Sequence, residues 1–162
     1  MSIFSSTKVI DLGSCSFRQW EANNTRPYAG ENPSRCGKNH GYLLKAKFWF
    51  GCKELDNKNW CVDYGSLKQL KAALNYMFDH TTLIDVADPL LPLFQELHDK
   101  GGCDLRVCPN GVGIERAAEY CFNVAQDMIK EQYGDRCWVE KVEVFEHENN
   151  SAIYTNPELQ IL

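Results

Sequence analysis

The sequence predicts an α+β fold in which an antiparallel four-stranded sheet carries helices on one face. Stretches near the two ends of the chain alternate between apolar and polar residues, with the period of two that is typical of strands. The stretches between them repeat their apolar residues with the spacing of amphipathic helices. Two hairpins that flank a helical middle section combine most simply into one sheet with its helices on a single face.

The first predicted hairpin combines residues 7–20 with residues 43–55. Residues 7–20 are rich in apolar and β-branched side chains, which favours a strand. The stretch between the two strands, residues 23–35, is rich in Pro, Asn and Gly, and we expect a long loop there. In residues 43–55, lysines alternate with apolar residues that would share one face, namely Leu44, Ala46, Phe48, Phe50 and Cys52.

The middle of the chain predicts two long amphipathic helices, a shorter helix between them and one short strand. Ser66 is a suitable N-cap for the first helix, because its hydroxyl can accept from the free amide groups of a helix start. Glycines follow the other two helices, where a C-terminal glycine commonly ends a helix. The predicted spans are residues 66–78 and 113–133 for the long helices, 88–100 for the shorter helix and 104–109 for the strand.

The second hairpin combines residues 138–147 with residues 151–155, joined by a polar turn. No linker, repeat or low-complexity segment interrupts the sequence, so we predict a single domain over residues 1–162 with its core in residues 7–155. A small open sheet has exposed edges, and oligomerisation into a closed barrel is a common way to remove them.

Composition and charge disfavour several classes of protein. The chain has 17 basic and 22 acidic residues and no basic run, so it lacks the electrostatic signature of a nucleic-acid surface. No stretch approaches the roughly 20 apolar residues that span a bilayer. The first residues do not resemble a signal peptide, and we therefore expect a cytoplasmic protein with reduced thiols. The eight cysteines include no C-x-x-C pair, which disfavours a structural zinc ribbon.

The stretch C-G-K-N-H-G-Y, from Cys36 to Tyr42, is the first candidate for chemistry. Cys36 lies between Arg35 and Lys38, and neighbouring cations stabilise a thiolate and raise its reactivity. The alternative is an ordinary loop cysteine.

The second candidate is the pair Asp79–His80, directly after the first long helix. A histidine moves protons near neutral pH, and an adjacent carboxylate can orient its ring if the chain turns there. The alternative is a histidine that interacts with the C-terminal end of the helix dipole.

Glu146 is the third candidate. By alternation it would share a face with Trp138, Val142 and Val144, and a carboxylate at the end of a buried face needs a partner. Two adjacent N–H groups of an amidine-like heterocycle would satisfy it through a bidentate hydrogen bond. The alternative is a solvent-exposed glutamate at the sheet edge.

These stretches together resemble the 6-pyruvoyltetrahydropterin synthase / 6-carboxytetrahydropterin synthase family. C-G-K-N-H-G-Y resembles its C-x-x-x-H-G-H motif, and W-C-V-D-Y-G-S-L-K resembles its strand-to-helix element. F-D-H-T-T-L-I-D resembles L-D-H-x-x-L-N, G-V-G-I-E resembles P-T-x-E, and F-E-H-E-N-N-S-A-I-Y resembles the closing segment of the family. Each motif alone is weak, but the five occur in the order of the family between residues 7 and 155.

The resemblance implies the tunnelling fold, or T-fold, whose ββααββ unit assembles into barrels, commonly as a hexamer with active sites between subunits. It implies 7,8-dihydroneopterin triphosphate as the substrate. It assigns Cys36 as base or nucleophile, Asp79 and His80 as a proton relay, and Glu146 as the anchor of the pterin ring. Glu115 matches a conserved glutamate of the family's second helix.

The sequence departs from the family at the zinc ligands. The family holds a catalytic zinc with three histidines, whereas the matching positions here are Glu21, His40 and Tyr42. One imidazole with a carboxylate and a phenol is a poor set for zinc, so we do not expect a standard three-histidine site. Arg18 is a further candidate, because its guanidinium could stabilise an oxyanion or bind a triphosphate. The alternative for Arg18 is an ordinary surface arginine on the first strand.

Two functional hypotheses follow from these residues. The first is a pterin synthase-like lyase in pterin or 7-deazaguanine (queuosine-type) biosynthesis, with zinc as the cofactor that the resemblance implies and no nucleotide cofactor. The second is a zinc-free T-fold that binds a pterin, a guanine-type base or a nucleotide without turnover. A third, weaker hypothesis is a zinc-independent T-fold reaction in which Cys36 is a covalent nucleophile toward a deazaguanine. In each case the expected partners are the small-molecule ligand and further copies of the chain.

Overall fold

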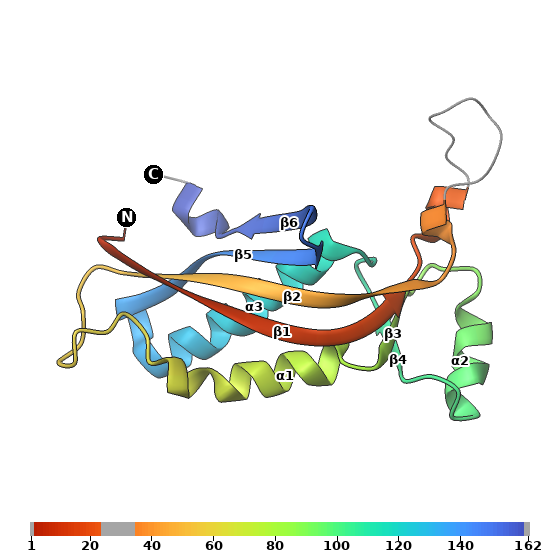
Figure 1. The fold of residues 1–162 in the computed structure, drawn as a ribbon, viewed down its shortest axis with the longest axis horizontal. Helices are drawn as coiled ribbons and strands as arrows, with labels where there is room; N and C mark the ends of the chain where they lie inside the picture. Colours follow the sequence, from red (N-terminus) through yellow and green to blue (C-terminus); the bar gives the residue numbers. More distant parts are fainter. Residues whose placement is uncertain (1, 24–34, 161–162) are drawn as a thin grey trace.

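The structure is a computed structural model that describes residues 2–23 and 35–160 (Figure 1). Most of the predicted 23–35 loop lies outside the described residues. Short 3₁₀ helices at Trp20–Asn23, Arg35–Gly37 and Tyr64–Leu67 connect some of the longer elements. The main elements are β1 (Phe4–Phe17), β2 (His40–Cys52), α1 (Lys68–Phe78), β3 (Thr81–Asp85), α2 (Leu91–Asp99), β4 (Leu105–Cys108), α3 (Ile114–Tyr133), β5 (Cys137–His147) and β6 (Asn150–Thr155).

The described chain forms a six-stranded sheet in the order β4-β3-β1-β2-β5-β6, so the prediction of four antiparallel strands was wrong. The two predicted hairpins are present and are joined through antiparallel pairing of β2 with β5. Strands β3 and β4 extend the sheet in parallel with the end of β1. The first four residues of β3 are all buried, so this strand has no apolar–polar alternation that would reveal it in the sequence.

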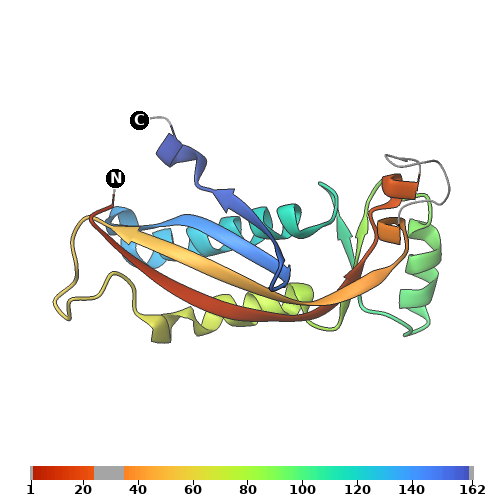
Figure 2. The ribbon, with the colours of Figure 1, turned by 45° about the horizontal axis from the view of Figure 1, so that its top comes forward.

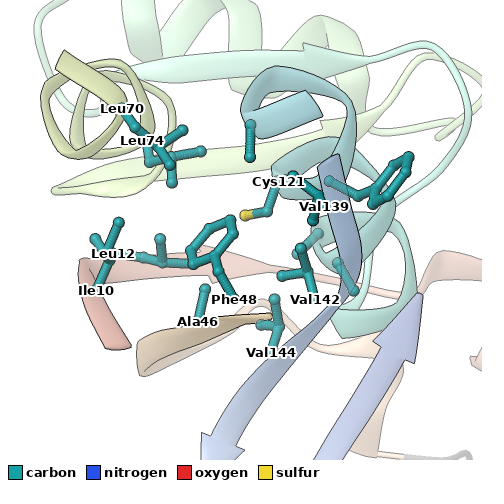
Figure 3. Close-up of a cluster of buried hydrophobic side chains, with 14 of the residues drawn as sticks. Ile10, Leu12, Ala46, Phe48, Leu70, Leu74, Cys121, Val139, Val142 and Val144 are labelled. Atoms are coloured by element: carbon teal, nitrogen blue, oxygen red, sulfur yellow. The ribbon is translucent and has the colours of Figure 1, made fainter. Parts of the chain in front are cut away.

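Helices α1 and α3 cover one face of the long curled strands, as predicted, whereas α2 lies beside β3 and β4 at one end (Figures 1 and 2). Their apolar faces meet the inward residues of β1, β2 and β5 (Figure 3). Full burial of a large apolar side chain stabilises a fold by about 1.5–3 kcal/mol. The fully buried residues include Leu12, Leu44, Phe48, Phe50, Leu70, Leu74, Phe78, Ile129, Val139, Val142 and Val144.

The alternation predicted for β5 was wrong at its start. Trp49 pairs with Lys141 and Phe50 with Val139, so Glu140 is an extra residue in a β-bulge. The bulge reverses the phase of the strand, and Val139 rather than Trp138 joins the buried face.

The start of the first helix also differs from the prediction. A 3₁₀ helix precedes α1, and Asp63 is its N-cap, since the Asp63 side chain accepts from the Gly65 amide. Ser66 is not a cap, because its hydroxyl donates to the Asp63 carbonyl. Asp63 therefore begins the helical segment three residues before Ser66. No helix among the described residues is long and apolar enough to cross a membrane.

Candidate functional site

The site begins where β1 and β2 extend beyond the helices. Phe17 is the register partner of His40, and Cys15 is the partner of Tyr42. Register partners share a sheet face, and Cys15 and Phe17 are buried on the core side. The four side chains therefore continue the core face past its helical cover.

Aromatic contacts hold Tyr42 at this end of the sheet. Its ring lies 5.4 Å from the ring of His40 in an edge-on contact and 5.9 Å from that of Phe17. On the other side, the ring of His147 lies 6.4 Å away. His147 is a site residue that our sequence analysis missed, although it directly follows Glu146 in the chain.

Glu146 lies at a second bulge of β5. Phe145 pairs with Ser151 and His147 with Asn150, so Glu146 has no partner on β6. Bulges commonly re-aim a side chain, and the half-buried Glu146 lies close enough to Tyr42 to affect the pKa of its phenol. Burial raises the pKa of Tyr42, and the nearby Glu146 carboxylate raises it further, as does nearby Cys36. The phenol thus keeps its proton at neutral pH.

Cys36 lies in the 3₁₀ helix Arg35–Gly37 and is exposed. The Cys36 carbonyl accepts a 2.9 Å hydrogen bond from the Gln19 amide, which fastens this loop to the chain just after β1. The Nδ1 atom of His40 lies 2.6 Å from the Lys38 carbonyl. Because a carbonyl only accepts, this geometry assigns the proton to Nδ1 and leaves Nε2 as an acceptor.

Asp79 and His80 form a pair at the turn between α1 and β3. The Nδ1 atom of His80 lies 2.9 Å from Asp79 Oδ1. The turn that this pairing requires is present, since His80 has a φ of 59°. The His80 amide donates to the Ser14 carbonyl at 2.7 Å, and the Ser14 amide donates to Asp79 Oδ1 at 3.3 Å. The imidazole is thus oriented by a carboxylate and is itself 85% exposed.

Cys36 and His80 are attached to the chain on either side of the end of β1. The His80 amide donates to the Ser14 carbonyl, whereas the Cys36 carbonyl accepts from the Gln19 amide, two residues after the strand ends. His80 and Tyr42 both line an open hollow of about 490 Å³ that also includes Ser16 and Thr82. The site residues thus fall into two groups that meet at this hollow, one around Glu146, Tyr42 and Cys36 and one around Asp79 and His80.

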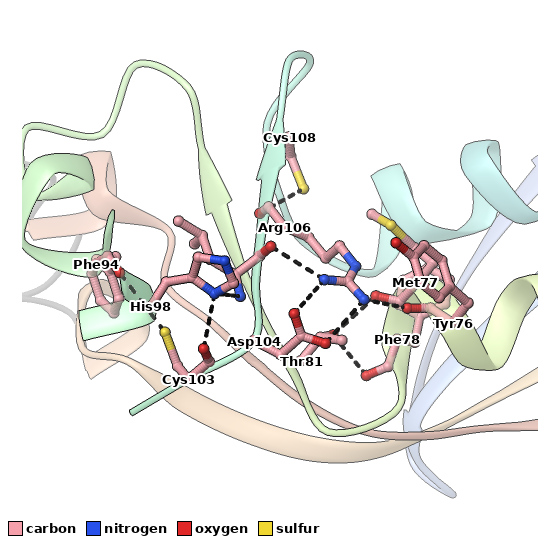
Figure 4. A network of polar contacts seen from close by, with 11 residues as sticks. Tyr76, Met77, Phe78, Thr81, Phe94, His98, Cys103, Asp104, Arg106 and Cys108 are labelled. Atoms are coloured by element: carbon pink, nitrogen blue, oxygen red, sulfur yellow. Dashed lines mark hydrogen bonds and ion pairs between the residues drawn. The ribbon is translucent and has the colours of Figure 1, made fainter. Parts of the chain in front are cut away.

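A polar network joins β4 to the C-terminal end of α1, directly before the Asp79–His80 turn (Figure 4). Arg106 on β4 forms an ion pair with Asp104 at 2.6 Å and donates to the Tyr76 carbonyl of α1 at 2.7 Å. The guanidinium also lies 4.6 Å from the centre of the Tyr76 ring. These contacts join β4 to the end of α1 and so stabilise the turn that carries Asp79 and His80.

Arg18 is buried, so it is not the ordinary surface arginine of the alternative. Its Nε lies 2.8 Å from Oδ2 of Asp88, whose side chain is fully buried, and the two form an ion pair. Arg18 therefore balances a structural charge. Glu21 is exposed in the 3₁₀ helix after β1. Glu115 lies in the first turn of α3, where a carboxylate is favoured by the helix dipole.

The residues at the family's zinc positions do not fit a zinc site. His40 and Tyr42 share a strand face, but burial and the nearby Glu146 carboxylate raise the pKa of Tyr42, whereas a ligand to zinc must be deprotonated. Within residues 2–23 and 35–160, no group of three or more His, Cys, Asp or Glu side chains is arranged to hold a metal ion. We therefore derive no chemical step through zinc.

A curled sheet with two helices on one face and a carboxylate, a thiol and an Asp–His pair near its end defines a protein of the T-fold class. The family model for 6-pyruvoyl tetrahydropterin synthase matches residues 15–157. The chain belongs to the 6-pyruvoyl tetrahydropterin synthase family, as the sequence motifs predicted.

Solved structures share this fold at low sequence identity. An uncharacterised protein from Wolinella succinogenes is 19% identical, with a TM-score of 0.78 over 94% of this chain and 98% of that chain. The 6-pyruvoyl tetrahydropterin synthase of Plasmodium vivax is 14% identical, with a TM-score of 0.63 over the same shares. The Caenorhabditis elegans synthase is 18% identical, with a TM-score of 0.60 over 96% of this chain and 97% of that chain. No curated protein matches the sequence.

Proposed function

We propose that this protein binds a pterin through Glu146 and acts as a 6-pyruvoyl- or 6-carboxytetrahydropterin synthase-like lyase. The observation that carries the proposal is the half-buried Glu146 carboxylate at a β-bulge, without a register partner on β6 and close to Tyr42. A carboxylate in this setting is suited to accept two parallel hydrogen bonds from the N–H groups of a pterin ring. The proposed substrate is 7,8-dihydroneopterin triphosphate or a related pterin, in pterin or 7-deazaguanine (queuosine-type) biosynthesis.

The proposed proton chemistry uses Cys36, Asp79 and His80. Asp79 holds the Nδ1 side of the His80 imidazole, which leaves Nε2 free to give or take a proton in the open hollow. Cys36 is an exposed thiol near Tyr42 and would act as the base or nucleophile toward the side chain of a pterin anchored on Glu146.

We further propose that two copies of the chain complete each active site. The attachment of the Cys36 loop to Gln19, beyond the end of β1, and of the Asp79–His80 turn to Ser14 supports this arrangement, because a second copy can supply the group that lies farther from the bound ligand. The proposed state is a homo-oligomer, either a hexamer or another T-fold barrel, in the cytoplasm. Mixing Cys36→Ser chains with His80→Ala chains tests it. Restored turnover in the mixed assembly is expected, and no activity above either parent would contradict the shared site.

A second candidate function is pterin or guanine-type base binding without turnover. It is favoured by Tyr42 and Glu21 at positions where the family has zinc-binding histidines. Without a bound metal ion, the electrophilic assistance that zinc supplies to the substrate side chain is absent, while ring binding by Glu146 is unaffected.

Metal analysis of protein purified without added zinc separates the two functions. About one zinc per chain, whose removal abolishes turnover of 7,8-dihydroneopterin triphosphate, would refute the binding-only function. Metal-free protein that binds pterin but gives no product would refute the lyase. A Cys36→Ser variant is the matched control, because it removes the proposed base and leaves Glu146 in place.

A further inference from the structure

Three polar side chains form a short chain of hydrogen bonds beside the hollow that His80 lines. The Asn39 Nδ2 atom donates to Ser16 Oγ at 3.4 Å, and Ser16 Oγ donates to Thr82 Oγ1 at 3.1 Å. Ser16 and Thr82 are register partners on β1 and β3, so the pairing of these strands sets the positions of both hydroxyls. Asn39 directly precedes β2, and the chain of bonds therefore runs from the start of β2 across β1 to β3.

The direction of these bonds leaves the Thr82 hydroxyl with a proton to donate. A hydroxyl has one proton, and Ser16 uses its proton toward Thr82, which accepts it. None of the hydrogen bonds formed within the described residues has Thr82 Oγ1 as its donor. By contrast, the hydroxyl of the neighbouring Thr81 donates to the carbonyls of Met77 and Phe78 at 2.9 and 2.8 Å. Thr81 thus serves the fold, whereas the Thr82 proton is available to a ligand.

Thr82 lines the open hollow of about 490 Å³ together with Ser16 and His80. Only 8% of Thr82 is exposed, and a polar group with so little access to solvent gains from a partner. His80 supplies the complementary group, because the Asp79 carboxylate holds the Nδ1 proton and leaves Nε2 of the neutral imidazole with a lone pair. The hollow therefore offers one donor and one acceptor, which together match a hydroxyl group of a ligand.

We propose that Thr82 is a binding residue that donates its hydroxyl proton to an oxygen atom of the ligand side chain, so that the hollow selects pterins with a hydroxylated side chain. The inference rests on the proposed function, because this side chain belongs to the pterin bound by Glu146. The hollow also includes Tyr42, which belongs to the group around Glu146. Thr82 falls on an x of the motif L-D-H-x-x-L-N, so the resemblance assigns it no role.

Two ligands and two substitutions test this role by calorimetry. Neopterin and pterin share the ring, but only neopterin carries hydroxyl groups on a side chain, and we expect wild-type protein to bind neopterin about tenfold more tightly. Thr82→Val keeps the β-branched shape and removes the hydroxyl, so the Kd for neopterin should rise about fivefold while the Kd for pterin stays unchanged. Thr82→Ser restores a hydroxyl at this position and should bind neopterin within about twofold of wild type.

Thr7→Val is the matched control, because it makes the same substitution at an exposed threonine toward the other end of β1, opposite Trp49. It should change the Kd of neither ligand. Equal changes for neopterin and pterin in Thr82→Val, or no change for either ligand, would overturn the proposal. A neopterin affinity that Thr82→Val lowers and Thr82→Ser does not lower supports it.

The two ligands also separate the inference from the function on which it rests. If wild-type protein binds neither pterin nor neopterin, the proposed function fails and the role of Thr82 fails with it. If wild-type protein binds both and Thr82→Val keeps the full preference for neopterin, the function stands and only the role of Thr82 fails. Equal binding of the two ligands by wild-type protein likewise leaves the function in place and refutes the selection by the hollow.

Discussion

Replacement of Gly13 by alanine should destabilise the fold and disturb the Asp79–His80 pair together. Gly13 directly follows the β1 bulge and has a φ of 96°, a conformation that costs a residue with a Cβ about 1–2 kcal/mol. A Cβ there would overlap the Asp79 carboxylate and lie 2.5 Å from the Asp79 Cβ. The carboxylate would have to leave its contacts with the Ser14 amide and the His80 imidazole.

The expected loss of stability combines the backbone strain at residue 13 with the lost hydrogen bonds of Asp79. Each lost hydrogen bond contributes about 1 kcal/mol, discounted here because the Asp79 side chain is 41% exposed and can reach water. With the backbone strain, we expect Gly13→Ala to lower the free energy of unfolding by about 3 kcal/mol, or the Tm by roughly 9 °C. Urea denaturation followed by tryptophan fluorescence measures this difference in the free energy of unfolding.

Gly101→Ala is the matched control for this prediction. Gly101 has a φ of 78°, but no atom lies within 4 Å of a Cβ built on it. It should therefore lose only the strain term, about 1 kcal/mol. Equal losses in the two variants would show that Asp79 does not occupy the space beside Gly13, and the account of the Asp79–His80 turn would be wrong.

Three further predictions address the site, the core and the thiols. Glu146→Ala should abolish measurable pterin binding in calorimetry under either proposed function, and unchanged affinity would contradict the assignment of the pocket. Arg18→Met leaves the Asp88 carboxylate buried without its cation and should lower the free energy of unfolding by about 3 kcal/mol. The double variant Arg18→Met/Asp88→Asn should recover part of this loss. A loss below about 1 kcal/mol in Arg18→Met would argue against a stabilising ion pair. Burial raises the pKa of Cys15 to about 12 and that of Cys108 to about 11 from an ordinary 9.0. Because the unfolded thiols release their protons from about pH 9 while the folded thiols retain theirs, the free energy of unfolding should fall as the pH rises from 9 to 11. The double variant Cys15→Ser/Cys108→Ser should show a smaller fall over this pH range.

The long regular elements were predictable because each carries a strong periodic signal. Leu44, Phe48 and Phe50 alternate with lysines over a whole strand, and Gly134 follows the last turn of α3 as expected. Strand β3 carried no such signal, since Leu83 and Ile84 follow two buried threonines without alternation. Its role in the sheet depends on the end of β1, which local sequence does not describe.

The site was predictable only in part. Motifs identified Cys36, Asp79, His80 and Glu146 as candidates, and their roles stay predictions. The ring contact of Tyr42 with His147 joins the start of β2 to the end of β5, and the bulge at Glu146 has no clear sequence marker. The burial of Arg18 depends on Asp88, a residue after β3, which is a strand that the sequence did not reveal.

The short pairing of β3 with β1 limits where a strand of another chain can add to the sheet. Strand β3 occupies the outer edge of β1 only at Cys15–Phe17, so in the described chain β1 has a neighbouring strand on one side alone from Phe4 to Gly13. A strand added to this free edge would meet a stop at Ser14, where the His80 amide already bonds to the β1 carbonyl. The edge thus limits the register of any added strand, and an incoming strand would end directly beside the imidazole of His80.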